Sequence, residues 1–140
     1  MATLQLPNTE RVFSLLVVDD ERSFREFLAE LLALSGFEVR QAANGDDALA
    51  MLKSSAPDLL ITDVIMEGTD GIDLIPMARK QHPNLPIIAM SGGGRIEAET
   101  YLEVGRHLGA DLTLRKPFRE AELLDAITRL LAQSDEFEAS

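Results

Sequence analysis

Short apolar runs alternate with longer amphipathic stretches along most of the chain. The apolar runs are rich in leucine, valine and isoleucine, which is typical of strands whose two faces are both covered by helices. The run FEVRQA alternates instead and suits a more exposed strand. The predicted strands are residues 13–18, 37–42, 58–62, 85–90 and 111–114.

The stretches between these runs carry apolar residues at helical spacing. Between residues 22 and 34 such residues recur at i, i+3, i+4, i+7 and i+8, which predicts a core-facing helix. They are Phe24, Phe27, Leu28, Leu31 and Leu32. We expect Asn44 to cap a second helix, Asp70 to cap a third, and Pro76 to kink or shorten that third helix. The third, fourth and fifth helices are predicted at residues 72–80, 95–107 and 118–131.

Regular alternation of strands and helices predicts an α/β fold with a parallel five-stranded sheet and crossover helices. A chain of 140 residues is the size of one ordinary domain. We therefore expect a single domain over residues 1–140, with its core at about residues 12–132. The first eleven residues and the acidic tail SDEFEAS are expected to be mobile ends.

Charge and composition narrow the classes of partner. The chain has 13 basic and 24 acidic residues, a formal charge of -11, and this argues against direct nucleic-acid binding, which needs clustered Lys and Arg. The absence of cysteine removes disulfides and thiolate chemistry. No apolar run approaches the roughly 20 residues that a membrane-spanning helix needs. We therefore expect a cytoplasmic protein that does not contact membranes.

Polar residues follow four of the predicted strands at their carboxyl ends. Asp19 and Asp20 follow the first strand, Asp63 the third, Ser91 the fourth and Lys116 the fifth. Ligands of open α/β sheets gather at that edge. Each residue alone is more often structural, as a helix cap, a turn residue or a solvated charge. Their joint occurrence at one edge favours a functional site.

The residue types at this edge favour phosphoryl transfer. Three crowded carboxylates repel one another unless a cation lies among them. Hard oxygen ligands without His or Cys favour Mg²⁺, which takes one or two carboxylates together with a phosphate oxygen. Asp63 could then act as the nucleophile and form an aspartyl phosphate. Lys116 and Ser91 would stabilise the phosphoryl oxygens.

Four segments together resemble the receiver domain of two-component response regulators, over about residues 13–132. They are LLVVDDE, DLLITDVIMEGTDG, IIAMS and GADLTLRKPF. The resemblance implies a flavodoxin-like (βα)5 three-layer sandwich with the strand order 2-1-3-4-5. No output domain is visible, so the chain resembles the stand-alone type of receiver.

The resemblance also implies a role for each matching residue. Asp63 corresponds to the phosphoacceptor and Asp20 to the direct magnesium ligand, while Asp19 would act through a water or by orienting its neighbours. Ile65 would offer its backbone carbonyl to the metal. The remaining two members of the set, Ser91 and Lys116, would bind the phosphoryl group, and a cis peptide bond is expected between Lys116 and Pro117.

The partners that the resemblance implies are a phosphodonor and an output protein. The phosphodonor would be a histidine kinase or a histidine phosphotransfer protein. The phosphorylated chain would signal by binding an unidentified target protein. The resemblance leaves open whether the chain also forms a homodimer. The chain would undergo self-phosphorylation and autodephosphorylation without being a turnover enzyme.

Several features depart from the family pattern. Thr113 stands where the family usually has a switching Tyr or Phe, and Glu67 replaces a common Pro. The segment between Ser91 and Lys116 is a few residues longer than expected, with the excess near Gly92–Gly94. We therefore hypothesise that activation is read mainly as ordering or displacement of residues 92–104, with a small role for position 113.

Two alternatives remain at this stage. A receiver that takes no phosphate could serve as a constitutive protein-binding module, and Glu67 and Thr113 keep that alternative open. A haloacid-dehalogenase-like phosphohydrolase also uses an Asp nucleophile with magnesium. Its DxD spacing is missing from VVDDER, however, and no cap insertion is present.

Overall fold

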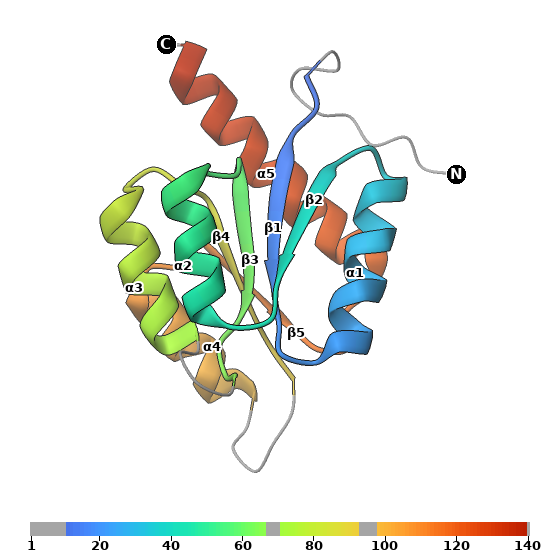
Figure 1. The fold of residues 1–140 in the computed structure, drawn as a ribbon. Coiled ribbons are helices and arrows are strands. Elements are labelled where there is room, and N and C mark those ends of the chain that lie inside the picture. Colours follow the sequence, from blue (N-terminus) through green and yellow to red (C-terminus); the bar gives the residue numbers. More distant parts are fainter. Residues whose placement is uncertain (1–10, 67–70, 93–97, 140) are drawn as a thin grey trace.

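Five parallel strands form one sheet in the computed structural model, which describes residues 11–66, 71–92 and 98–139. The strand order is β2-β1-β3-β4-β5, and every strand is followed by a helix (Figure 1). The α/β class and the flavodoxin-like order are therefore confirmed. The strands are β1 (Ser14–Val18), β2 (Glu38–Ala42), β3 (Leu59–Asp63), β4 (Ile87–Ser91) and β5 (Leu112–Arg115).

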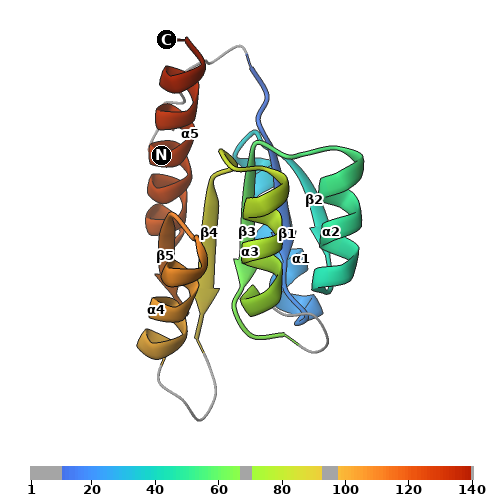
Figure 2. The ribbon, with the colours of Figure 1, turned by 90° about the vertical axis from the view of Figure 1, so that its left-hand side faces the viewer.

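Helices cover both faces of the sheet and make it the middle of three layers (Figures 1 and 2). One face is covered by α1 (Arg22–Leu34) and α5 (Glu120–Ala139). The other is covered by α2 (Gly45–Ser54), α3 (Gly71–Gln81) and α4 (Ala98–Leu108). The carboxyl ends of the strands meet at the lower edge of the sheet in Figure 1.

Successive residues of a strand face opposite layers, which explains the unbroken apolar runs of the sequence. In β1, Leu15 and Val17 belong to the hydrophobic cluster formed with α1 and α5. Leu16 and Val18 belong to the cluster formed with α2 and α3. All four side chains are fully buried, so a polar substitution at any of them would place an unpaired group in a core.

Two glycines end helices in the left-handed region of backbone space. Gly36 follows α1 with φ +100° and Gly109 follows α4 with φ +125°, a conformation that other residues rarely adopt. Asn44 caps α2 as predicted, because its side-chain oxygen accepts the Asp47 backbone N–H at 2.8 Å. The predicted Asp70 cap lies outside the described residues.

The predicted end of the fifth helix is wrong. Helix α5 continues beyond Leu131 to Ala139, and the expected mobility of the SDEFEAS tail stays a prediction. That tail contains neither Gly nor Pro to stop a helix. Helix α3 continues through Pro76 to Gln81, so Pro76 does not shorten it, and the alternative expectation of a kink stays a prediction. The predicted start of α4 at Arg95 lies outside the described residues.

Candidate functional site

Two buried carboxylates lie side by side at the carboxyl edge of the sheet. Asp19 directly follows β1 and Asp63 ends β3, and these neighbouring strands are paired up to Val18 and Thr62. Only 1% of Asp19 and 9% of Asp63 is exposed. Charged side chains are rarely so deeply buried without a partner.

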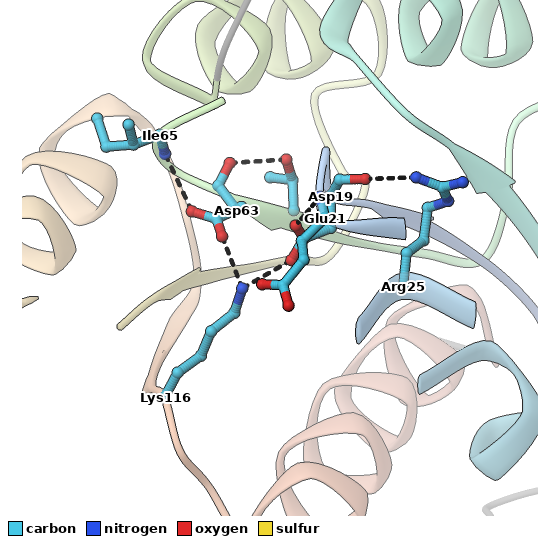
Figure 3. Close-up of polar contacts among 7 residues, drawn as sticks. Asp19, Glu21, Arg25, Asp63, Ile65 and Lys116 are labelled. Carbon is cyan, nitrogen blue, oxygen red and sulfur yellow. Dashed lines mark hydrogen bonds and ion pairs between the residues drawn. The ribbon is translucent and has the colours of Figure 1, made fainter. Parts of the chain in front are cut away.

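Lys116 supplies that partner. It directly follows β5, and its Nζ donates to Oδ2 of Asp19 and to Oδ2 of Asp63, each at 2.7 Å (Figure 3). These distances are typical of strong, charge-assisted hydrogen bonds. The peptide bond between Lys116 and Pro117 is cis, as expected. The chain itself therefore supplies one positive charge between two of the three crowded carboxylates, Asp19 and Asp63.

Backbone N–H groups orient both carboxylates. Oδ1 of Asp19 accepts the Glu21 N–H at 2.9 Å, and Oδ1 of Asp63 accepts the Ile65 N–H at 3.0 Å (Figure 3). Each carboxylate thus uses one oxygen for its own loop and the other for Lys116. Arg25 of α1 donates from Nη1 to the Asp19 carbonyl at 2.9 Å, which ties the first turn of α1 to the same loop.

Burial and charge shift the proton affinities of Asp63 and Lys116. Burial raises the pKa of Asp63 and outweighs the opposing effects of the Lys116 ammonium and the Ile65 N–H. Burial alone would lower the pKa of Lys116, but hydrogen bonds and charges from Asp19 and Asp63 outweigh it and raise that pKa. Lys116 is therefore held as an ammonium between the two acids.

Ser91 joins the cluster through its backbone. It ends β4 and is 2% exposed, and its carbonyl accepts the Lys116 N–H at 2.8 Å. Gly92 follows, and a Cβ built on it would overlap the Cβ of Lys116. The end of β4 therefore sets the position of the lysine backbone.

The other predicted site residues lie around this centre. Asp20 is exposed beside Asp19, and Ile65 follows Asp63 by two residues with 39% of its surface exposed. Thr113 is partly buried and pairs with Ala89 of β4. Glu67, with Gly93 and Gly94, lies outside the described residues.

The donor atoms at this edge suit a hard cation. The groups that the sequence predicts as metal ligands, namely Asp19, Asp20, Asp63 and the Ile65 carbonyl, would offer oxygen atoms only. Within residues 11–66, 71–92 and 98–139, no group of three or more His, Cys, Asp or Glu side chains is placed to hold a metal ion. Magnesium does not need such a group, because it keeps several waters and takes one or two carboxylates.

No helix in the same ranges is long and apolar enough to cross a membrane.

One aromatic pair lies beside Lys116 and was not predicted from the sequence. The apolar spacing places Phe24 on the core-facing stripe of α1, and Phe24 does pack against that core. Its ring also lies 4.2 Å from the Lys116 Nζ, measured to the ring centroid, and contacts the ring of Phe118. The only signal in the sequence was the position of Phe24 in the first turn after the acidic loop.

Comparisons with known proteins agree with the geometry. The family model described as the response regulator receiver domain matches residues 15–128. The chain is 40% identical over 120 residues to the transcriptional regulatory protein CpxR of Klebsiella pneumoniae, covering 86% of this chain and 50% of that protein. It is 36% identical to the response regulator MprA of Mycobacterium avium, covering 86% and 51%. The chain thus spans about half the length of these curated relatives.

Solved structures show the same fold. A putative response regulator from Chloroflexus aurantiacus is 38% identical with a TM-score of 0.78, covering 87% of this chain and 99% of that one. NtrX from Brucella abortus is 33% identical with a TM-score of 0.84, covering 92% and 29%. These likenesses do not favour the haloacid-dehalogenase alternative. The chain belongs to the family of response regulator receiver domains.

Proposed function

We propose that Asp63 accepts a phosphoryl group from a phosphohistidine and that the resulting state is read by another protein. The observation that carries this proposal is the Asp63 carboxylate itself. It is buried at the carboxyl edge of the sheet, oriented by the Ile65 N–H and bonded to the Lys116 ammonium. A preoriented carboxylate beside a fixed positive charge is suited to attack phosphorus and to stabilise the transferred group.

In this reaction a carboxylate oxygen of Asp63 attacks the phosphorus, and a P–O bond forms as the P–N bond to the histidine breaks. The electron pair of that bond returns to the imidazole nitrogen, which takes up a proton. Negative charge on the phosphoryl oxygens requires nearby donors, which Lys116 and the Ser91 hydroxyl provide. Because Lys116 is also bonded to Asp19 at 2.7 Å, it stays at the site when Asp63 becomes an acyl phosphate.

Magnesium fits the donor set of this site. The residues that would hold it are Asp20 and Asp63, with Asp19 acting through a water and Ile65 offering its carbonyl. When bound, magnesium supplies positive charge to the phosphoryl oxygens. The exposed position of Asp20 and the oxygen-only donors support the proposal.

The phosphodonor is a histidine kinase or a histidine phosphotransfer protein, which the family supports. The chain acts as a phosphoacceptor with self-phosphorylation and autodephosphorylation chemistry and not as a turnover enzyme. Its output is a phosphorylation-dependent contact with a target protein.

The test is incubation with acetyl phosphate and Mg²⁺, followed by intact-mass analysis. Wild type should gain one acid-labile phosphoryl group and Asp63→Asn none. Asp73→Asn, which changes an exposed aspartate of α3, should be modified like wild type. Full modification of Asp63→Asn would refute the assignment. An unmodified wild type would favour a constitutive protein-binding module instead.

A further inference from the structure

The Lys116 ammonium has a third neighbour that the phosphoryl-transfer chemistry does not explain. An ammonium has three N–H groups, and the Lys116 Nζ uses two of them to donate to Oδ2 of Asp19 and Oδ2 of Asp63, each at 2.7 Å. On another side lies the ring of Phe24, with its centroid 4.2 Å from Nζ. A cation this close to an aromatic ring is attracted by the ring quadrupole, more strongly where water is excluded.

Phe24 is itself held by an aromatic contact. Its ring centroid lies 6.0 Å from that of Phe118, with the planes 82° apart in an edge-to-face arrangement. Both rings are partly buried against the hydrophobic cluster under α1 and α5. Phe118 is two residues beyond Lys116 in the chain. The segment after β5 therefore carries both Lys116 and Phe118, and Phe118 packs against the Phe24 ring that Lys116 contacts.

We propose that Phe24 is a positioning residue that holds the Lys116 ammonium at the phosphoryl site. The inference rests on the function proposed above. A lysine side chain has four flexible carbons and loses considerable rotamer entropy when it is fixed. Formation of the aspartyl phosphate moves the negative charge from the Asp63 carboxylate to the phosphoryl oxygens, so the ammonium has to exchange one of its two anionic contacts. The remaining contacts, with Asp19 and Phe24, then keep the ammonium within reach of the phosphoryl oxygens.

A purely structural role makes a different prediction. If Phe24 only fills space in the core, leucine should replace it with a modest loss of stability and no effect on Lys116. If the ring face holds the ammonium, leucine should release it, and tryptophan, which has a stronger quadrupole, should hold it.

The first experiment measures the NMR signals of the Lys116 side chain. The chain has three lysines, Lys53, Lys80 and Lys116, so selective ¹³C-lysine labelling gives few side-chain signals. The ring should shift the Lys116 ε-methylene protons upfield in wild type. We expect this shift to be lost in Phe24→Leu and kept in Phe24→Trp. Phe27→Leu is the matched control, because Phe27 lies on the same helix with 61% of its surface exposed, and it should leave the signal unchanged.

The second experiment measures phosphorylation of Asp63 by acetyl phosphate with Mg²⁺. Phe24→Leu should lower the maximal rate about three- to tenfold, a range that corresponds to a cation–π contact, with little change in the half-saturating concentration. Phe24→Trp should restore the rate. An unmoved Lys116 signal or a wild-type rate in Phe24→Leu overturns the inference and leaves Asp63 as phosphoacceptor. An unphosphorylated wild type overturns the proposed function, and the inference falls with it.

Discussion

Gly92 lies so close to Lys116 that a Cβ built on it would overlap the lysine Cβ and stand 2.9 Å from the lysine Cα. The same two segments are joined by the hydrogen bond from the Lys116 N–H to the Ser91 carbonyl, at 2.8 Å. The backbone after β4 therefore packs directly on the residue that carries the ammonium. Only glycine leaves room for this contact.

A Gly92→Ala substitution should displace Lys116 and weaken its bridge between Asp19 and Asp63. We expect phosphorylation of Asp63 by acetyl phosphate to slow about tenfold, which is on the order of 1.4 kcal/mol. The free energy of unfolding should fall by about 1 to 3 kcal/mol, because overpacked positions force their neighbours to shift. Rates from intact-mass time courses and urea titrations would measure both.

Gly36→Ala is the control for that substitution. Gly36 has φ +100° and no atom within 4 Å of a built Cβ. Alanine there should cost about 1 to 2 kcal/mol of stability through backbone strain, with phosphorylation unchanged. Wild-type kinetics in Gly92→Ala would mean that the contact does not restrict the site.

Replacing Asp63 with asparagine should stabilise the protein more at neutral pH than in acid. Burial raises the pKa of Asp63 above the ordinary 3.8, so the folded state binds this proton more tightly than the unfolded state. The stability that the proton confers is present below pH 3.8 and is lost as the pH rises through the raised pKa. Asp63→Asn avoids this loss, while Lys116 keeps its bond to Asp19.

Urea titrations of wild type and Asp63→Asn between pH 4 and pH 8 would check this. The difference in unfolding free energy should grow as the pH rises. Asp73→Asn, at an exposed position of α3, should show no such growth. A difference that shrinks as the pH rises would contradict a raised pKa of Asp63.

Magnesium should stabilise the folded chain, because it offsets the repulsion among Asp19, Asp20 and Asp63. At tenfold excess over the dissociation constant the gain should be about 1.4 kcal/mol, measured as a rise in melting temperature. Asp20→Ala should remove most of this gain. Glu30→Ala changes an exposed carboxylate of α1 and should respond as wild type does. A shift of full size in Asp20→Ala would exclude Asp20 as a direct ligand.

Arg79 should matter for stability and not for phosphorylation. Its guanidinium donates to the carbonyls of Pro83 at 2.8 Å, Leu85 at 2.7 Å and Gly109 at 2.7 Å, and to Asp111 Oδ2 at 2.9 Å. These groups lie at the amino-terminal edge of β4 and β5, opposite Asp63 and Lys116.

We therefore expect Arg79→Ala to lower the free energy of unfolding by about 1 to 2 kcal/mol, since the partly buried carbonyls of Leu85 and Gly109 lose their donor. Arg129→Ala removes an exposed i,i+4 ion pair with Asp125 and should change stability by less than about 0.5 kcal/mol. Urea titration and the acetyl phosphate assay would separate the two effects. A large loss of phosphorylation in folded Arg79→Ala would show that the two edges are coupled.

The order of strands and helices and the residues at the strand ends could be predicted from the sequence, because each follows from a local pattern. Apolar runs and helical spacing marked the elements, and Asp19, Asp63 and Lys116 directly follow or end β1, β3 and β5. The full length of α5 was missed, since the tail beyond Leu131 lacks the apolar spacing of a packed helix. The hypothesis that residues 92–104 read activation stays a prediction, because residues 93–97 lie outside the described part of the chain.

Only the tertiary structure decided how these side chains meet. Lys116 is 97 residues from Asp19 and 53 from Asp63 along the chain, and no local pattern indicates that one ammonium bridges both carboxylates. The Phe24 contact and the requirement for Gly92 likewise depend on how α1, the end of β4 and the segment after β5 pack together. Periodicity along a chain shows which face of an element is buried, whereas the contacts across an edge of a sheet are set by strand order, register and the close packing of loops.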